Sequence, residues 1–236
     1  MKDKKKNVID MFDKVAKRYD FLNHLLSFGL DFGWRKKAVK RFEKLDSSSY
    51  VMDLCSGTGD MTFSLIKNDG FRGRSILIDG SMNMLRIARR KAEREITSSD
   101  LNYILADAEH LPIGDKFLDA AMIAFGIRNL ADPVAGLREI FRVLKPGGEF
   151  IVLEFTMPDS WVFRRIYLFY FTVILPFIGG IISKKSAYRY LPGSVLRFDN
   201  IYDLKEELTR AGFTFIQKQK MGFGIVILWY SRKPLK

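Results

Sequence analysis

A short glycine turn between acidic residues predicts a site for a nucleoside-containing ligand. Gly57-Thr58-Gly59 follows the apolar segment 50–55 and precedes a segment with a helical pattern that runs to about Lys67. A strand, a glycine turn and a helix in this order bring backbone N–H groups close to a phosphate or nucleoside, and glycine has no Cβ to collide with it. The third glycine of the dinucleotide pattern is replaced by Thr62, which disfavours a dinucleotide.

Aspartates end the first three predicted strands. Asp79 lies 20 residues beyond Gly59, a spacing that suits a carboxylate accepting hydrogen bonds from ribose hydroxyls. Asp107 is placed to accept from an adenine amino group, and Asp53 is placed to order the glycine turn. Each acid alone is more simply explained as a cap or turn former. Together at the sheet edge where ligands bind in such folds, they predict a nucleoside site.

The elements that must position these residues alternate between strand and helix. Five apolar segments are predicted strands: 50–55, 74–79, 101–106, 118–125 and 149–155. Ser81 is a predicted N-cap, and Asp132 followed by Pro133 is a second helix start. Nearly continuous apolar strands that alternate with helices favour an α/β fold with a parallel sheet covered on both faces.

The two ends of the chain add further predicted elements. Helices are predicted at 8–22, 32–45 and 201–211, with a polar break at 47–49. Segments 213–219 and 223–230 are predicted strands joined by a tight turn at Met221-Gly222, so the seven-stranded sheet ends in an antiparallel hairpin. We expect one domain over 1–236 with four parts: an N-terminal helical extension (1–46), a cofactor-binding core (47–156), a helical lid insertion (157–200), and a terminal helix and hairpin (201–236).

Composition and charge narrow the classes of protein. Of 236 residues, 47% are hydrophobic and 28% charged, which is typical of a globular chain. One cysteine and two histidines disfavour a disulfide framework and a Cys- or His-rich metal centre, and no apolar stretch follows Met1–Lys6, so we expect a cytoplasmic protein without metal. The net charge of +12 is concentrated at the two ends of the chain. It suggests a phosphate, an anionic membrane or only a soluble surface.

Several motifs beyond the glycine turn carry a family resemblance. They are 53–60 (DLCSGTGD), 18–23 (RYDFLN) with 26–29 (LSFG) and Trp34-Arg35, 107–112 (DAEHLP), 125–129 (FGIRN), and 188–192 (YRYLP) with Ser194. The first resembles the glycine motif of class I S-adenosylmethionine-dependent methyltransferases. Together the motifs resemble the ubiquinone/menaquinone-biosynthesis C-methyltransferase family over about 8–233. The resemblance implies a Rossmann-like class I fold and methyl transfer to a ring carbon of a prenylated quinol.

The resemblance also implies site residues. Those expected to bind S-adenosylmethionine or shape its site are Asp53, Gly57, Thr58, Gly59, Asp79, Asp107, Ala108 and Ala124. Ala124 stands where the family often has serine, and Asp31 where histidine is common. Phe198-Asp199 replaces a usual Phe-Pro, and Trp229 falls where the last strand often has histidine. These departures leave another small apolar acceptor open as the substrate.

A quinol carbon becomes nucleophilic when a ring hydroxyl ionises, which requires help at neutral pH. Our hypothesis is that Arg128 and Asn129 hold the hydroxyl oxygen, with Arg128 stabilising the anion because guanidinium stays protonated. The candidate bases are three residues of the N-terminal segment: Asp20, His24 and Asp31. Three tyrosines either line the acceptor pocket or pack in the core: Tyr19, Tyr188 and Tyr190.

Residues 166–182 have no charge, and Arg164-Arg165 and Lys184-Lys185 flank them. A spanning helix needs about 20 apolar residues, and Pro176 and two glycines interrupt this one, so a buried or interfacial lid is favoured over a membrane span. The interfacial version predicts peripheral contact with the inner face of an anionic membrane. A homodimer is left open.

The sequence disfavours two other classes of protein. Nucleic-acid methylation at an exocyclic amine usually needs an Asn/Asp-Pro-Pro-aromatic stretch, where this chain has 124–127 (AFGI), and pyrimidine-C5 methylation needs a cysteine, whereas Cys55 lies in the glycine turn. We therefore expect no nucleic-acid partner. A non-enzymatic interaction protein is disfavoured by the intact glycine turn together with Asp79 and Arg128.

Overall fold

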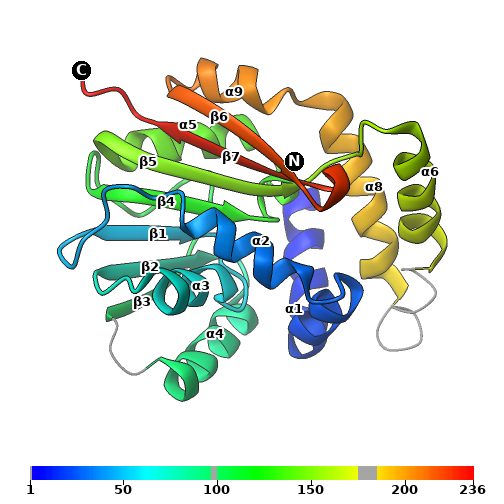
Figure 1. Cartoon of the computed structure of the whole chain (residues 1–236). Helices are drawn as coiled ribbons and strands as arrows, with labels where there is room; N and C mark the ends of the chain where they lie inside the picture. The colour runs from blue at the N-terminus through cyan, green and yellow to red at the C-terminus, as the bar shows by residue number, and fades with distance from the viewer. Residues whose placement is uncertain (1, 97–99, 175–184) are drawn as a thin grey trace.

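The sheet lies at the centre of the molecule. The structure, a computed structural model, describes residues 2–96, 100–174 and 185–236. The described chain forms a seven-stranded sheet of order β3-β2-β1-β4-β5-β7-β6 (Figure 1). The strands are β1 Tyr50–Leu54, β2 Arg74–Asp79, β3 Asp100–Leu105, β4 Leu118–Ala124, β5 Leu144–Phe155, β6 Thr214–Met221 and β7 Val226–Arg232. The first five strands pair in parallel and β7 pairs antiparallel with both β5 and β6, so the predicted mostly parallel sheet with a terminal hairpin is confirmed.

Helices cover both faces of this sheet. The α-helices are α1 Lys2–Leu26, α2 Leu30–Val39, α3 Asp60–Asp69, α4 Met82–Glu95, α5 Pro133–Val143, α6 Trp161–Phe169, α8 Lys185–Ile201 and α9 Leu204–Arg210. Helices α2 and α3 pack on one face through a cluster that includes Val51 and Met122, and α5 and α9 pack on the other through a cluster that includes Met52. Because neighbouring residues of β1 face opposite sides and both faces are buried, the strand is apolar apart from the buried Asp53.

The predicted helix starts are confirmed at two positions. The Ser81 hydroxyl accepts a hydrogen bond from the backbone N of Met84 at 3.1 Å. The Asp132 carboxylate accepts from the backbone N of Val134 and of Ala135, each at 3.0 Å, and Pro133 stands at the first helical position. Both caps satisfy N–H groups that would otherwise lack partners at a helix start.

Several predicted boundaries were wrong, among them the start of the helix predicted at 201–211, which begins at Leu204. The helix predicted at 32–45 ends at Val39, since the chain then turns and the backbone N–H of Glu43 and of Lys44 donate to the buried Glu149 carboxylate. Strand β5 begins before 149, because Leu144 already pairs with Leu118 across a shift of register. Phe223 is not in a strand: its φ of 57° places it in a turn.

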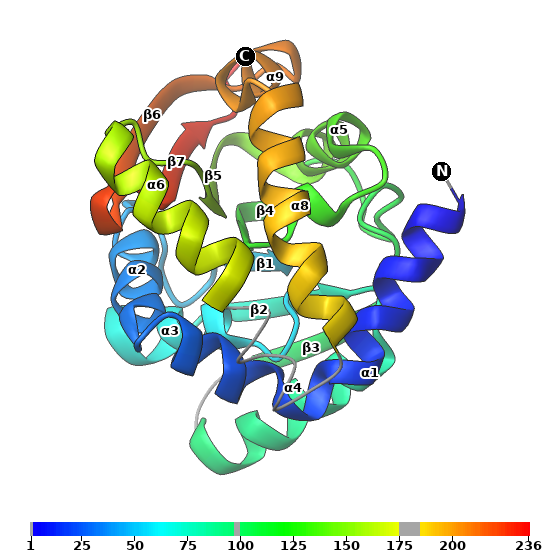
Figure 2. The same cartoon turned by 90° about the vertical axis from the view of Figure 1, so that its right-hand side faces the viewer.

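Helices α1, α6 and α8 lie over the carboxyl edge of the sheet. Figure 2 views this edge directly, with α1 crossing below α6 and α8. Helix α1 is longer than the predicted 8–22 and contacts α2, α4 and α8. Helix α6 continues as a π-helical turn, Tyr170–Ile174, while residues 175–182 of the predicted lid lie outside the described ranges. Among the described helices, none is long and apolar enough to cross a membrane.

Candidate functional site

The glycine turn between β1 and α3 has a backbone that only glycine adopts easily. Gly57 and Gly59 have φ of 54° and 86°, in the left-handed region that disfavours other residues. A Cβ on Gly59 would lie 2.8 Å from Cζ of Phe63, whereas a Cβ on Gly57 would meet no atom within 4 Å. Gly57 therefore leaves open space for a ligand, and Gly59 allows α3 to pack closely behind the turn.

Asp53 orders this turn from behind. Its carboxylate accepts from Thr62 through the backbone N at 3.1 Å and through Oγ1 at 2.7 Å. Burial raises the pKa of Asp53 to about 7, although the bonds from Thr62 oppose the shift. Asp53 does not line the neighbouring cavity. Its position supports the predicted role in ordering the turn rather than contact with a cofactor.

A cavity of about 360 Å³ opens where β1, β2, β3 and β4 end. It brings together five residues predicted for the cofactor site: Gly57, Asp79, Asp107, Ala108 and Ala124. Thr58 and Gly59 do not line it. Asp79 accepts from the backbone N of Gly57 and of Ser81, each at 2.8 Å, and burial still raises the pKa of Asp79. Each of its oxygens keeps acceptor capacity for a ribose hydroxyl.

Helix α1 closes the cavity, which sequence reasoning missed. The residues of α1 that line it are Lys5, Val8, Ile9, Phe12 and Tyr19. Lys5 forms an ion pair with Asp107, which also accepts from the backbone N of Glu109 at 2.9 Å. Burial alone would raise the pKa of Asp107, but these partners together lower it. The apolar spacing along α1 was visible in the sequence, but it did not show which surface that face would cover.

Polar contacts hold the second half of α1 in place. Asp20 accepts from the hydroxyl of Thr58 and pairs with Lys91 of α4 at 2.8 Å, and Lys91 also pairs with Asp60. Asp20 lines neither of the two cavities described here. The structure therefore gives no support to Asp20 as a base, and Thr58 serves to fix α1.

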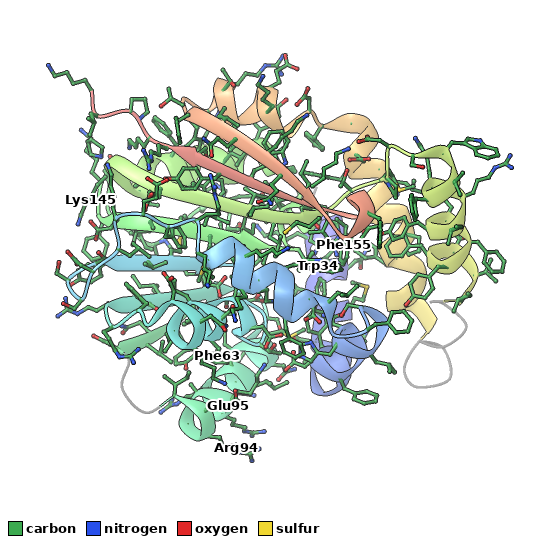
Figure 3. The ribbon with its side chains drawn as sticks, viewed as in Figure 1. Trp34, Phe63, Arg94, Glu95, Lys145 and Phe155 are labelled. Carbon is green, nitrogen blue, oxygen red and sulfur yellow. The ribbon has the colours of Figure 1, made fainter. Side chains whose placement is uncertain are left out.

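A second cavity, of about 230 Å³, adjoins the first. The two share Phe12, Tyr19 and Phe125 as lining residues. The second cavity lies between α1, α2, α6 and α8, and most of its lining is aromatic or aliphatic. Trp34 and Phe155, labelled in Figure 3, contribute to it from α2 and from the end of β5. An apolar molecule in this cavity would meet the cofactor cavity at the three shared residues.

Arg128 lines the second cavity but is paired inside the protein. It forms a buried ion pair with Glu154, and its Nη1 also donates to the carbonyl of Phe125 at 2.6 Å. Burial raises the pKa of Glu154, and Arg128 opposes that shift. Sequence reasoning missed Glu154, although a single acid inside the apolar strand 150–155 was a signal for a buried partner.

Asn129 lies on the cofactor side. Its Nδ2 donates to the carbonyl of Phe125 at 3.2 Å, and its Oδ1 accepts from the hydroxyl of Tyr190 at 3.2 Å. Asn129 lines the first cavity and Tyr190 the second. Tyr19 lines both cavities, and burial raises its pKa. The side chain of Tyr188 lies outside the described part of the chain.

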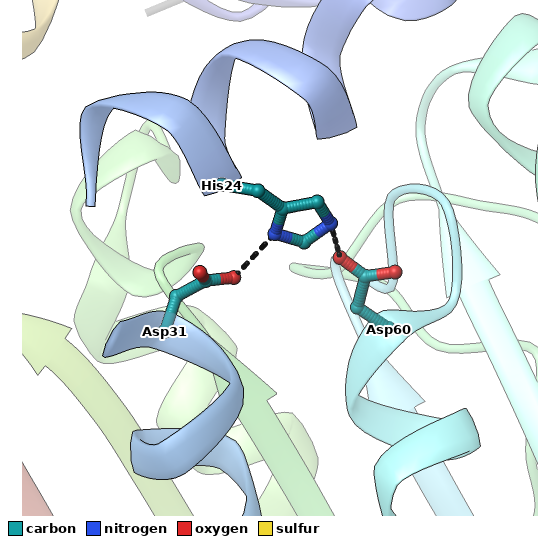
Figure 4. Close-up of side chains that lie close together, drawn as sticks. All are labelled: His24, Asp31 and Asp60. Atoms are coloured by element: carbon teal, nitrogen blue, oxygen red, sulfur yellow. Dashed lines mark hydrogen bonds and ion pairs between the residues drawn. The ribbon is translucent and has the colours of Figure 1, made fainter. Parts of the chain in front are cut away.

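His24, Asp31 and Asp60 form a polar cluster (Figure 4). His24 Nδ1 lies 2.7 Å from Asp31 and its Nε2 lies 3.7 Å from Asp60. The three side chains offer ligand atoms within 4.8 Å of one another, the donor types of a metal site. Arg35 and Lys91 already pair with these carboxylates, so the cluster serves better as a latch between α1, α2 and α3.

Of the candidate bases, only Asp31 lines the second cavity. Its side chain is buried, which alone would raise the pKa of Asp31, but Arg35, Ser27 and His24 together lower it. Asp31 is therefore ionised over the physiological range, and its carboxylate is a weak base. His24 stacks on Phe32 with ring centroids 4.2 Å apart. Its ring nitrogen is hydrogen-bonded to Asp31, and His24 does not line the cavity.

The sheet order, the glycine turn and the carboxylates at the strand ends define the class I methyltransferase fold. A methyltransferase of Thermotoga maritima has the same fold, with a TM-score of 0.66 at 20% identity over 96% of this chain and 99% of that one. A phosphoethanolamine N-methyltransferase of Haemonchus contortus, solved with S-adenosyl-L-methionine, gives 0.67 at 16% identity over 96% of this chain and 60% of that one.

The sequence model of the ubiE/COQ5 methyltransferase family matches residues 1–233. The chain is 42% identical to the demethylmenaquinone methyltransferase of Thermus thermophilus, over 95% of this chain and all of that one. It is 38% identical to the ubiquinone/menaquinone biosynthesis C-methyltransferase UbiE of Geotalea daltonii, over 98% of each chain. The chain therefore belongs to the ubiE/COQ5 methyltransferase family, and the predicted family membership is confirmed.

Proposed function

We propose that this chain transfers a methyl group from S-adenosylmethionine to a ring carbon of a prenylated quinol. The observation that carries the proposal is the meeting of two different cavities. One has a glycine cradle and carboxylates at the strand ends, and the other is aromatic, and they share Phe12, Tyr19 and Phe125. The names of the relatives, demethylmenaquinone methyltransferase and UbiE, support a quinol as the acceptor.

The residues of the first cavity fit the proposed cofactor. The open space at Gly57 and the acceptor oxygens of Asp79 suit a nucleoside with ribose hydroxyls. Ala108 and Ala124 give small apolar walls, and Asp107 adds a carboxylate at the far end. When bound, the cofactor supplies an electrophilic methyl group on its sulfonium. The chain itself binds and aligns the two partners and excludes water, and alignment alone contributes several kcal/mol.

The acceptor must lose a hydroxyl proton to become a good carbon nucleophile. With a phenol-like pKa of about 10, ionisation at neutral pH costs about 4 kcal/mol. Arg128 lines the second cavity, which we call the acceptor cavity. It stays protonated, so it stabilises the anionic oxygen rather than removing the proton. Asn129 and Tyr190 connect the two cavities through their mutual hydrogen bond.

The balance of the reaction is simple. The electron pair of the ring carbon forms the new carbon–carbon bond, and the electrons of the broken carbon–sulfur bond stay on sulfur. The ring carbon then loses its proton, which restores the aromatic ring. The net products are the methylated quinol, the neutral thioether and one proton.

Peripheral membrane contact is part of the proposal. Phe28 and Leu30 line the acceptor cavity and are also 79% and 52% exposed, so the mouth of the cavity has an apolar rim. Trp161, Ile166 and Phe169 extend an exposed apolar surface along α6. Residues 160–198 contain six Lys/Arg and no Asp/Glu. This combination suits an anionic bilayer from the cytoplasmic side, with the prenyl tail leaving through the rim.

The first experiment is methyl transfer from labelled S-adenosylmethionine to two reduced acceptors in detergent: demethylmenaquinol and a demethylated benzoquinol. We expect label on a ring carbon of at least one, and the preferred acceptor identifies the ring. Tight cofactor binding without transfer to either quinol would contradict the proposal and favour another small apolar acceptor.

A further inference from the structure

Two polar atoms on the wall of the second cavity lack partners. The Tyr167 hydroxyl and Nε of Arg128 are fully buried, and neither has a hydrogen-bond partner among the described residues. Both residues line the second cavity, and the Tyr167 side chain is only 8% exposed. Buried polar groups in proteins are nearly always hydrogen-bonded. Two that are not, on the wall of one cavity, indicate a polar atom of a bound molecule.

Both donors are held in place by the fold. Tyr167 lies on α6 and stacks against Phe171 with ring centroids 4.7 Å apart, in a small apolar cluster with Met157 and Val195. Arg128 is fixed by Glu154 and by the carbonyl of Phe125. Preorganised donors of this kind need little rearrangement when charge develops on a bound oxygen.

We propose that Tyr167 and Nε of Arg128 together donate hydrogen bonds to one ring oxygen of the acceptor and stabilise it as an anion. This inference rests on the proposed function and adds Tyr167 to it as a catalytic residue that touches the substrate. Glu154 balances the charge of Arg128, so the preference for the anion depends on directed N–H and O–H donors rather than on net positive charge. Tyr167 therefore contributes to this preference together with the arginine.

The two groups have the correct protonation for this role. Burial raises the pKa of Tyr167 well above its usual value, more than the opposing charge of Arg128 lowers it. The hydroxyl therefore stays protonated and donates, and guanidinium N–H groups donate only. The hydroxyl proton of the acceptor leaves to the buffer before transfer, and the same oxygen takes a proton back after the ring has become aromatic again, so that one proton is released overall. The ring proton leaves after the carbon–carbon bond has formed and the carbon–sulfur electrons have gone to sulfur.

The test is Tyr167→Phe in the full-length chain, assayed with the reduced quinol that the native chain methylates. We expect kcat at neutral pH to fall about 10- to 100-fold, the effect of losing one donor to a charged oxygen. The Kd for S-adenosylmethionine should not change. The melting temperature should stay equal or rise, because the lost hydroxyl has no protein partner. Tyr202→Phe, outside both cavities, is the matched control.

The pH dependence of kcat separates this role from a structural one. With both substrates saturating, the acidic limb reports ionisation in the bound complex. Tyr167→Phe should move that limb to higher pH, by about one unit for each tenfold weaker binding of the anion. A native chain that transfers to no quinol would overturn the proposed function. A native chain that transfers, with Tyr167→Phe equal to Tyr202→Phe or with its loss explained by a lower melting temperature, would overturn the role of Tyr167 alone.

Discussion

At the residue scale, the buried carboxylate of Asp53 behind the glycine turn makes the stability of the fold depend on pH. Its pKa in the folded chain is about 7, compared with about 3.9 for an unperturbed aspartate. Because the folded value is higher, folding favours the protonated form. The stabilisation is complete below pH 4 and is lost as pH rises through 7.

We therefore predict that Asp53→Asn removes this pH dependence. Between pH 4 and pH 8 the free energy of unfolding of the native chain should fall, relative to the variant, by up to roughly 4 kcal/mol. Asparagine can still accept from Thr62 through its carbonyl oxygen. Urea titrations at several pH values measure the difference. Parallel curves for the two proteins would show that Asp53 titrates as it does in the unfolded chain.

The buried pair of Arg128 and Glu154 gives a second prediction at this scale. Arg128→Ala leaves the Glu154 carboxylate buried and unpaired, so we expect a loss of roughly 3–5 kcal/mol in unfolding free energy as well as a loss of turnover. Arg128→Met with Glu154→Gln should recover most of the stability but none of the turnover, because the donor to the acceptor oxygen is still missing. Urea unfolding and the quinol assay together check both halves. Equal stability of the single and double variants would refute the pairing.

At the element scale, α1 acts as a closure over the cofactor cavity. Lys91 of α4 pairs with Asp20 of α1 and with Asp60 of α3 while its side chain is 21% exposed. We predict that Lys91→Met weakens closure by about 1–2 kcal/mol, which corresponds to a ~5–30-fold higher Kd for S-adenosylmethionine. Equilibrium binding by calorimetry measures this. Lys67→Met, which removes an exposed pair between α3 and α4, is the control and should leave the Kd unchanged.

The sequence predicted elements better than it predicted contacts between them. Apolar strands and the caps at Ser81 and Asp132 are local signals, so the sheet and its helices were predictable. The turn at 222–224 was missed because phenylalanine is common in strands, whereas Phe223 adopts a positive φ. The pairing of Arg128 with Glu154 joins residues 26 positions apart and depends on the register of β4 and β5.

The site residues were also predictable where the signal is local, and not where it depends on contacts between distant elements. Gly57, Asp79 and Asp107 follow from their positions at strand ends and meet in one cavity as predicted. Tyr167 could not be assigned from the sequence, because its environment depends on how α6 folds back over the sheet edge. The division of the chain into four parts and the individual catalytic roles stay predictions.

At the scale of the whole molecule, charge and apolar surface gather near the mouth of the acceptor cavity. Arg164 and Arg165 lie on α6, and Arg165 lies over the ring of the exposed Trp161 at 4.3 Å. We predict that changing both arginines to alanine weakens binding to phosphatidylglycerol vesicles by about 2 kcal/mol, ~30-fold. Co-sedimentation with vesicles measures it, with phosphatidylcholine vesicles as the uncharged comparison.

The control for this prediction is another pair of adjacent arginines. Arg89 and Arg90 are exposed on α4, a helix that lies apart from α6 (Figure 1). Their replacement by alanine removes the same formal charge and should change vesicle binding much less. Equal losses from both pairs would mean that binding follows net charge rather than an oriented surface.

Helix α1 covers both cavities, so its motion also affects how the two substrates enter and leave. Phe12 and Tyr19 border both cavities, so an occupant of either one restricts the motion of α1 that would release the other. We predict that the donor binds first and leaves last, so that the spent donor is released only after the acceptor site has emptied. Steady-state product inhibition should accordingly be competitive between the two forms of the donor and mixed against the quinol.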